Sequence, residues 1–164
     1  ILNRAKLMKF DPQQGDSVLE LGSQMGGFLQ LTVLNGSTWV EGVEIDYDYL
    51  QCSCVLLQPI TSDDQHVVVH NGDISLESTL LDARSRTPEV LDHLILASLG
   101  KHIGGAKTLD LILKIFDNAK TVYFETNAVK DEQIEEETCI EKHGGIYIGE
   151  TSDRNRRRVW LLQR

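Results

Sequence analysis

Residues 18–28 read Val-Leu-Glu-Leu-Gly-Ser-Gln-Met-Gly-Gly-Phe, an apolar run that ends in a glycine-rich turn. The run predicts a buried strand over residues 17–21, and a helix is expected over about residues 26–34. Gly22 permits a sharp turn between the two elements, and Gly26 allows the backbone to come close to a ligand. Strand, turn and helix in this order predict a ligand site at the start of a βαβ unit.

The same apolar pattern continues along the chain and predicts the other elements. Further strands are expected over residues 38–45, 66–70, 91–97 and 121–126, and further helices over residues 48–58, 109–116 and 131–142. Two final segments, 146–149 and 158–162, are typical of an antiparallel pair. Strands that alternate with helices imply right-handed crossovers. We therefore predict an α/β fold, a Rossmann-like seven-stranded mostly parallel sheet with helices on both faces and a C-terminal antiparallel hairpin.

Length and composition indicate one domain. The chain has 164 residues, of which 41% are hydrophobic, enough for one sizeable core but not for two domains. We expect residues 1–164 to form that domain, and because the sequence begins at Ile1 rather than Met, an accessory segment can precede it. No apolar run is long enough to cross a bilayer and no signal peptide is visible, which predicts a soluble, cytoplasmic protein without a membrane partner.

Charge and cysteine content exclude some classes of site. A formal net charge of −9 argues against a surface that binds nucleic acid through general electrostatics. The three cysteines suit a reducing compartment, and without a C-x-x-C pair we predict no metal site. In the helix over 48–58, Leu50, Cys54 and Leu57 are expected on one face.

Acidic residues follow the second and third predicted strands. Glu44 stands roughly 20 residues after the glycine turn, where a carboxylate can accept both hydrogen bonds of a ribose diol. Glu44 is preferred over Asp46 because it ends the apolar run, with Asp46 as an additional acceptor. Asp73, after the third strand, can accept from an adenine amino group. Solvated strand-end acids and ordinary turn chemistry are the alternatives.

The glycine turn departs from the dinucleotide-binding fingerprint. That fingerprint requires G-x-G-x-x-G, and Gln24 occupies the position of its second glycine. A pyrophosphate needs the close approach that this glycine allows. A nicotinamide-dependent oxidoreductase is therefore the less favoured nucleotide-binding function.

Three motifs together resemble a known family. Residues 20–28 look like the first motif of class I S-adenosylmethionine-dependent methyltransferases, residues 42–46 like their acidic second-strand motif, and residues 72–74 like their third. The resemblance covers essentially the whole chain, including the order of strands and helices.

Shorter stretches resemble one branch of that family, the branch related to tRNA wobble-uridine methyltransferases. These stretches are Leu91–Leu96, Leu99–His102 and Thr121–Asn127. In that branch the first motif commonly reads Leu-Gly-Cys-Asn-x-Gly, and Gln24 stands where it has Asn. Lys101 replaces the usual tyrosine before the histidine, so the substrate, and activity itself, stay open.

The resemblance implies S-adenosylmethionine as the cofactor and implies where it binds. The methionine moiety would lie against Gly22 and Gly26, the ribose on Glu44 and the adenine beside Asp73. The cofactor-binding residues that we predict in this way are Glu20, Gly22, Ser23, Gln24, Gly26, Glu44, Ile45, Asp73 and Ile74.

Catalysis chiefly requires alignment of the acceptor, and a group that receives a proton is needed only if the acceptor demands it. His102 is the candidate base because histidine titrates near neutral pH, and a histidine without a proton role is the alternative. The Asn/Asp-Pro-Pro-aromatic signature of N-methyltransferases is absent after Leu96. We therefore predict a methyltransferase that acts on an oxygen acceptor, on an RNA nucleoside or a small molecule. A catalytically silent binding or regulatory domain is the alternative function.

Three charged or polar segments are given structural interpretations. The basic run from Arg154 to Arg158 is expected to be a solvated turn rather than a contact for RNA phosphates. Glu125 and Asn127 are expected to serve in a cap or turn rather than to orient the acceptor. Four glutamates are expected on a solvated helix face, namely Glu132, Glu135, Glu136 and Glu137.

Overall fold

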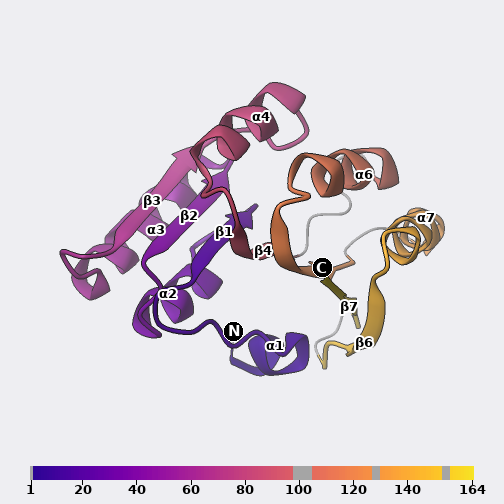
Figure 1. The fold of residues 1–164 in the computed structure, drawn as a ribbon, viewed down its shortest axis with the longest axis horizontal. Coiled ribbons are helices and arrows are strands. Elements are labelled where there is room, and N and C mark those ends of the chain that lie inside the picture. Colours follow the sequence, from indigo (N-terminus) through magenta and orange to yellow (C-terminus); the bar gives the residue numbers. More distant parts are fainter. Residues whose placement is uncertain (1, 98–104, 127–129, 153–155) are drawn as a thin grey trace.

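A computed structural model describes residues 2–97, 105–126, 130–152 and 156–164. The described chain forms a seven-stranded sheet in the order β3-β2-β1-β4-β5-β7-β6 (Figure 1). Strands β1 to β5 pair in parallel, and β7 pairs antiparallel with both β5 and β6. The strands are β1 (Ser17–Leu21), β2 (Trp39–Glu44), β3 (His66–Asn71), β4 (Leu91–Ala97), β5 (Ala119–Glu125), β6 (Ile146–Glu150) and β7 (Arg158–Gln163).

Helices cover both faces of this sheet (Figure 1). Helices α4, α6 and α7 lie on one face, and α1, α2 and α3 lie on the other. Their bounds are α1 (Leu2–Met8), α2 (Gly27–Leu34), α3 (Tyr47–Leu57), α4 (Glu77–Arg86), α6 (Ala106–Ile115) and α7 (Lys130–Lys142), with a short 3-10 helix η1 (Gln58–Ile60) after α3. The predicted fold class is confirmed.

Burial explains why these segments became strands. Every residue of β1 is buried, and β4 is buried over its last four residues, because helices cover both sides of the central strands. On the α4–α6–α7 face, four apolar residues at positions i, i+3, i+4 and i+7 of the helix predicted over 109–116 are all buried, namely Leu109, Ile112, Leu113 and Phe116. The periodic apolar pattern therefore identified α6 correctly.

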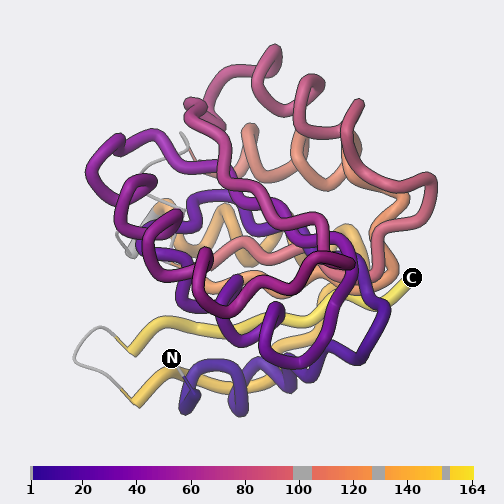
Figure 2. The backbone as a smooth tube through the Cα atoms, turned by 90° about the vertical axis from the view of Figure 1, so that its left-hand side faces the viewer, coloured from indigo at the N-terminus to yellow at the C-terminus, as the bar shows by residue number. Residues whose placement is uncertain are grey.

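On the opposite face, the N-terminal helix packs against the C-terminal hairpin. Helix α1 packs against β6 and β7, and Figure 2 shows it beside the C-terminal hairpin. Ala5 and Met8 of α1 belong to the same apolar cluster as Val159 of β7. Among the described helices, none is both long and apolar enough to cross a bilayer.

Helix α3 corrects one prediction. Its buried side chains are Leu50, Ser53 and Leu57, whereas Cys54 is exposed. The reason is that Ser53 donates a hydrogen bond from its hydroxyl to the backbone oxygen of Gln24, at 2.6 Å, in the turn after β1. The buried face of α3 therefore contains Ser53, whereas the periodicity predicted Cys54 there.

Two solvated-surface predictions are also wrong in part. Glu136 is fully buried, although its neighbour Glu135 is exposed as expected. In the basic run, Arg157 pairs with Glu125 and Arg158 pairs with Glu137, and only Arg156 of the described arginines there is mostly exposed. The run is therefore half-buried in ion pairs, because β7 is an inner strand between β5 and β6. Arg154 lies outside the described residues.

The topology fixes where a ligand can bind. Strands β1, β2 and β3 follow one another from the middle of the sheet to one edge. The next strand, β4, then pairs with the other side of β1. Crossover connections therefore leave opposite faces at the carboxyl ends of β1 and β4, which opens a crevice there. The glycine turn lies at this point.

Candidate functional site

The turn between β1 and α2 has an uncommon backbone. Gly22 has φ 76°, Gln24 has φ 49° and Gly26 has φ 70°, all in the left-handed region. Glycine adopts this region without steric cost, but glutamine does so at a cost of about 1–2 kcal/mol. Surrounding contacts must therefore hold Gln24 in this conformation.

Those contacts come from β2 and α3. The backbone oxygen of Val43 accepts from the amides of Gly22 and Ser23, at 2.8 and 3.1 Å. The amide of Gln24 donates to Glu44 Oε2 at 2.7 Å, and its backbone oxygen accepts from Ser53. Both peptide groups around Gln24 are thus fixed, which stabilises the strained turn.

Glu44 has a second partner at the end of β2. Its side chain is 5% exposed, and Oε1 accepts from the amide of Asp46 at 2.8 Å. Asp46 itself caps α3, because Oδ1 accepts from the amides of Asp48 and Tyr49 at 2.9 and 3.2 Å. A carboxylate can accept about four hydrogen bonds in total. Glu44 therefore retains acceptor capacity toward the cavity beside it.

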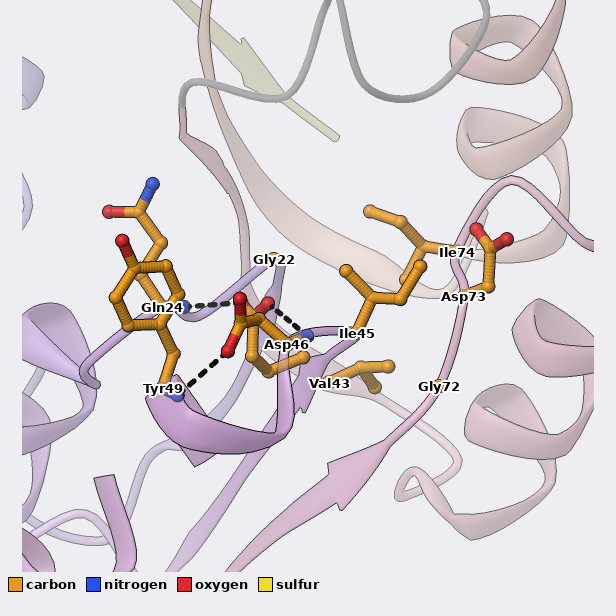
Figure 3. A pocket seen from close by; sticks show the side chains of 10 residues that line it. Gly22, Gln24, Val43, Ile45, Asp46, Tyr49, Gly72, Asp73 and Ile74 are labelled. Carbon is orange, nitrogen blue, oxygen red and sulfur yellow. Dashed lines mark hydrogen bonds between the residues drawn. The ribbon is translucent and has the colours of Figure 1, made fainter. Parts of the chain in front are cut away.

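That cavity has a volume of about 290 Å³ and is shown in Figure 3. In the view, Gln24 and Tyr49 lie at one end, Asp73 and Ile74 lie at the other, and Ile45 lies between them. The lining residues are Gly22, Gln24, Val43, Glu44, Ile45, Asp46, Tyr49, Gly72, Asp73 and Ile74. Six of the nine predicted cofactor residues are in this set.

The far end of the cavity combines an acid with apolar walls. Asp73 Oδ1 accepts from the amide and the hydroxyl of Ser75, at 2.9 and 2.7 Å, and these bonds fix the carboxylate. Ile74 is 8% exposed, whereas Ile45 is 63% exposed although its side chain is large and apolar. An exposed isoleucine beside a buried one provides a surface for a flat apolar group.

A second cavity of about 270 Å³ lies against the same turn. It shares Gly22 and Gln24 with the first cavity, and Ala97 at the end of β4 contributes to its wall. The lining residues are Arg4, Glu20, Gly22, Ser23, Gln24, Met25, Gly27, Phe28, Gln30, Leu56 and Ala97. Of the predicted cofactor residues, Gly26 lines neither cavity. Its left-handed backbone instead starts α2.

Two buried polar atoms of this second cavity lack partners. Glu20 Oε2 and the hydroxyl of Ser23 make no hydrogen bond within the described residues, although both side chains are almost fully buried. Burial raises the pKa of the Glu20 carboxyl well above its usual value, and the positive charge of Arg4 partly opposes this. Buried polar groups without partners cost free energy, which makes a hydrogen-bonding ligand favourable here.

The end of β5 carries a buried ion-pair group. Glu125 is fully buried and contacts Arg4 through Oε2, with Nε at 3.0 Å, and Arg157 through Oε1, with Nη1 at 3.1 Å. Its oxygens are therefore used to hold α1 and β7 against the sheet, and Glu125 forms buried ion pairs at the end of β5 rather than the cap or turn expected from the sequence. His102 and Asn127 lie outside the described residues.

Sequence reasoning missed three contributors to the site. Arg4 comes from α1, and its partner Glu125 is distant in the sequence, so no local pattern links them. Neither Ser53 nor Tyr49 of α3 was singled out. The N-cap position of Asp46 was detectable, because aspartate directly before a helix is a strong capping signal.

Solved methyltransferases share this fold. The bifunctional kinase-methyltransferase WbdD matches with a TM-score of 0.69 and 19% identity over 98% of this chain, which spans 36% of the WbdD chain. Magnesium protoporphyrin IX methyltransferase from Synechocystis PCC 6803, solved with bound SAM, matches with a TM-score of 0.68 and 14% identity over 98% of this chain and 75% of its own. TrmK from M. capricolum, solved with S-adenosyl-homocysteine, matches with a TM-score of 0.63 and 13% identity over 96% of this chain and 66% of its own.

Sequence comparison adds no closer relative. No protein-family model matches the chain, and no curated protein sequence matches it either. The fold expected from the resemblance is thus confirmed by structures that share it, and function has to be argued from the site.

Proposed function

We propose that this chain binds S-adenosylmethionine and transfers its methyl group to an oxygen acceptor, on an RNA nucleoside or on a small molecule. The observation that carries the proposal is the pair of cavities that meet at the glycine turn. S-adenosylmethionine has a nucleoside end and an amino-acid end, and each cavity suits one of them. Two proteins of the same fold were solved with this cofactor or its demethylated product, which supports the assignment.

The first cavity suits the nucleoside end. Glu44 would use its remaining acceptor capacity for the two ribose hydroxyls, while its bonds to the amides of Gln24 and Asp46 hold the carboxylate in place. The adenine would lie along Ile45 and Ile74, with its amino group donating to Asp73. Apolar walls with a few fixed polar groups are the usual composition of such sites.

The second cavity suits the amino-acid end. An ammonium group would supply hydrogen-bond donors to Glu20 Oε2 and to the hydroxyl of Ser23, the two buried atoms that lack partners. Its positive charge would also favour the ionised form of Glu20, whose pKa burial raises. A nicotinamide dinucleotide has no ammonium group at the corresponding position, and this favours the sulfonium cofactor.

The reaction makes two demands on the chain. The bound cofactor supplies a methyl group that its sulfonium centre makes electrophilic. The protein has to align the acceptor oxygen with this methyl group and has to accept the proton that a hydroxyl acceptor releases. We assign the proton to His102, which follows β4, the strand whose last residue Ala97 lines the second cavity.

An oxygen acceptor is proposed because the chain lacks the N-methyltransferase signature after Leu96. The RNA nucleoside and the small molecule both provide hydroxyl or carboxylate oxygens.

A catalytically silent binding domain is the second candidate function. It is favoured by one observation: both oxygens of Glu44 already accept backbone amides of the turn and strand end. If those bonds use all of the acceptor capacity of the carboxylate, Glu44 organises the turn and does not bind a ribose. Cofactor binding without methyl transfer, or no binding at all, would be the property of such a domain.

A transfer assay separates the two functions. The chain is incubated with S-adenosylmethionine labelled in the methyl group, together with total RNA in one reaction and a metabolite pool in another. Label in either acceptor fraction supports the enzyme, and the fraction identifies the acceptor class. We expect His102→Ala to lose transfer while binding the cofactor normally, and exposed Glu89→Ala to behave as the unchanged chain. Cofactor binding without label in either fraction would favour the silent domain.

A further inference from the structure

Three side chains of types that can bind metals converge where α6 packs against α7. Asp110 belongs to α6, Cys139 belongs to α7, and His143 directly follows the last residue of α7. One ligand atom from each lies within 4.8 Å of the other two. Figure 1 shows the two helices side by side, at the side of the molecule away from α2 and α3.

The backbone of α7 holds its two ligands on one face. Cys139 and His143 are four residues apart, and the His143 amide donates to the Cys139 backbone oxygen at 3.3 Å, which extends the helical pattern by one residue. The amide of Gly145 then donates to the backbone oxygen of Ile140 at 2.8 Å and closes the helix end. The imidazole is therefore placed by the fold itself.

The distances suit a tetrahedral ion. Asp110 Oδ1 and His143 Nε2 are 2.8 Å apart. Ligand atoms around tetrahedral zinc are about 3.3 Å apart for a nitrogen–oxygen pair and about 3.5 Å apart for a sulfur–nitrogen pair, given the usual bond lengths. The distance between Asp110 Oδ1 and His143 Nε2 therefore has to increase by a few tenths of an ångström. The Cys139 sulfur has to close by about 1.3 Å at most.

We propose that Cys139 Sγ, His143 Nε2 and Asp110 Oδ1 bind Zn²⁺, with water as the fourth ligand. This site is separate from the proposed cofactor cavities and does not depend on them. On binding, the Cys139 thiol releases its proton to solvent as the zinc–sulfur bond forms, and His143 coordinates through Nε2 while its remaining ring proton resides on Nδ1. Thiolate, carboxylate and neutral imidazole together balance the two charges of the ion.

A cysteine nucleophile is the competing use of these residues. The arrangement of aspartate, histidine and cysteine resembles the order of groups that activates a thiol. Burial, however, raises the pKa of the Cys139 thiol, with the negative charge of Asp110 acting in the same direction. A nucleophile requires the opposite change, whereas a zinc ligand gains its thiolate from the metal.

Lys142 and Lys114 are nearby positive groups that could oppose a cation, since the charges of both act on the Cys139 thiol. Lys114 is also hydrogen-bonded to one of the ligands. It donates to Asp110 Oδ2 at 2.5 Å, and so leaves Oδ1 facing His143. The Lys114 side chain is 64% exposed and can turn to solvent. The ion would link α6 to α7, the helices that follow β4 and β5 in the chain.

Cobalt provides the test, because Co²⁺ takes the same tetrahedral ligands and reports thiolate binding in its spectrum. The reduced chain is titrated with Co²⁺ and then with Zn²⁺. We expect one Co²⁺ per chain with a thiolate-to-metal charge-transfer band, which Zn²⁺ abolishes by displacement. Cys139→Ser should lose the band, and Asp110→Asn and His143→Gln should weaken Co²⁺ binding by at least about tenfold. The double variant Cys52→Ser/Cys54→Ser, which changes only exposed thiols, should keep the band.

Two results would overturn the proposal. One is the absence of a thiolate band at millimolar Co²⁺. The other is a band that persists in Cys139→Ser and disappears when Cys52 and Cys54 are replaced. Far-ultraviolet circular dichroism shows whether each variant is folded, and if Cys139→Ser is not, the variants Asp110→Asn and His143→Gln, at half-buried positions, decide the question by the same titration.

Discussion

Replacement of Glu136 by glutamine is expected to stabilise the protein in mildly alkaline solution. Glu136 lies on α7 with 0% of its side chain exposed, and neither carboxylate oxygen has a hydrogen-bond partner within the described residues. Burial, together with the negative charges of Glu132 and Glu137, raises its pKa from the ordinary value of 4.5 to about 7. The folded chain therefore keeps a proton that the unfolded chain releases.

The size and sign of the effect follow from linkage. The unfolded carboxyl ionises as the pH rises above 4.5, while the folded one stays protonated up to about pH 7. The contribution of protonated Glu136 to the free energy of unfolding is therefore fully present below pH 4.5 and declines up to about pH 7. The difference between the two pKa values corresponds to about 3 kcal/mol of stability, at about 1.4 kcal/mol per pH unit. Glutamine has a similar shape and no charge, so Glu136→Gln should recover most of that loss at pH 8.

Thermal and urea unfolding at pH 5 and pH 8 measure this effect. At pH 8 we expect Glu136→Gln to unfold about 6–12 °C above the unchanged chain, since about 1 kcal/mol moves Tm by about 2–4 °C at this size. At pH 5 the two chains should differ little. Glu135→Gln, on the same helix but exposed, is the matched control and should have no such effect. Equal behaviour of the two variants at pH 8 would refute the reasoning.

Two further substitutions test the turn and the ion pair. Gly26→Ala should destabilise the fold more than Gly15→Ala in urea unfolding, because both glycines have positive φ but only at Gly26 would a Cβ approach the Ser53 hydroxyl, at 3.2 Å; equal losses would contradict a close approach there. Arg157→Met should lower the free energy of unfolding by about 1–3 kcal/mol, because it removes a charged hydrogen bond from fully buried Glu125; an unchanged urea midpoint would mean that the pair contributes nothing.

The sheet was predictable because its central strands are buried on both sides. A strand covered by helices on two faces has to be almost continuously apolar, and β1 and β4 show this in the sequence. The strand bounds were accordingly predicted to within one or two residues. The final hairpin was predicted for a different reason, because two short segments, 146–149 and 158–162, stand on either side of a polar stretch of sequence.

Helices α1 and α4 were missed for a physical reason. Helix α4 buries only Leu80 and Ala83 over its length, and α1 buries only Ala5 and Met8. Two buried side chains per helix do not produce a recognisable apolar period. Their positions are instead fixed by the sheet face that they cover, which is a tertiary effect.

The site was predicted as a set of residues but not as a set of contacts. The glycine turn and the strand-end acids were visible because each lies directly after a strand, where parallel sheets bind ligands. That Glu44 would bond to the Gln24 amide was not visible, because it depends on the left-handed backbone of Gln24. Glu136 shows the same limit, since a charged residue on a polar helix gives no signal of burial.

Titration calorimetry with S-adenosylmethionine and S-adenosylhomocysteine tests the central claim most directly. We predict one molecule bound per chain, little or no binding of NADH, loss of binding in Glu44→Lys, and retention of binding in the exposed control Glu89→Lys. Absence of binding by both sulfur compounds, or unchanged affinity in Glu44→Lys, would contradict the assignment of the two cavities.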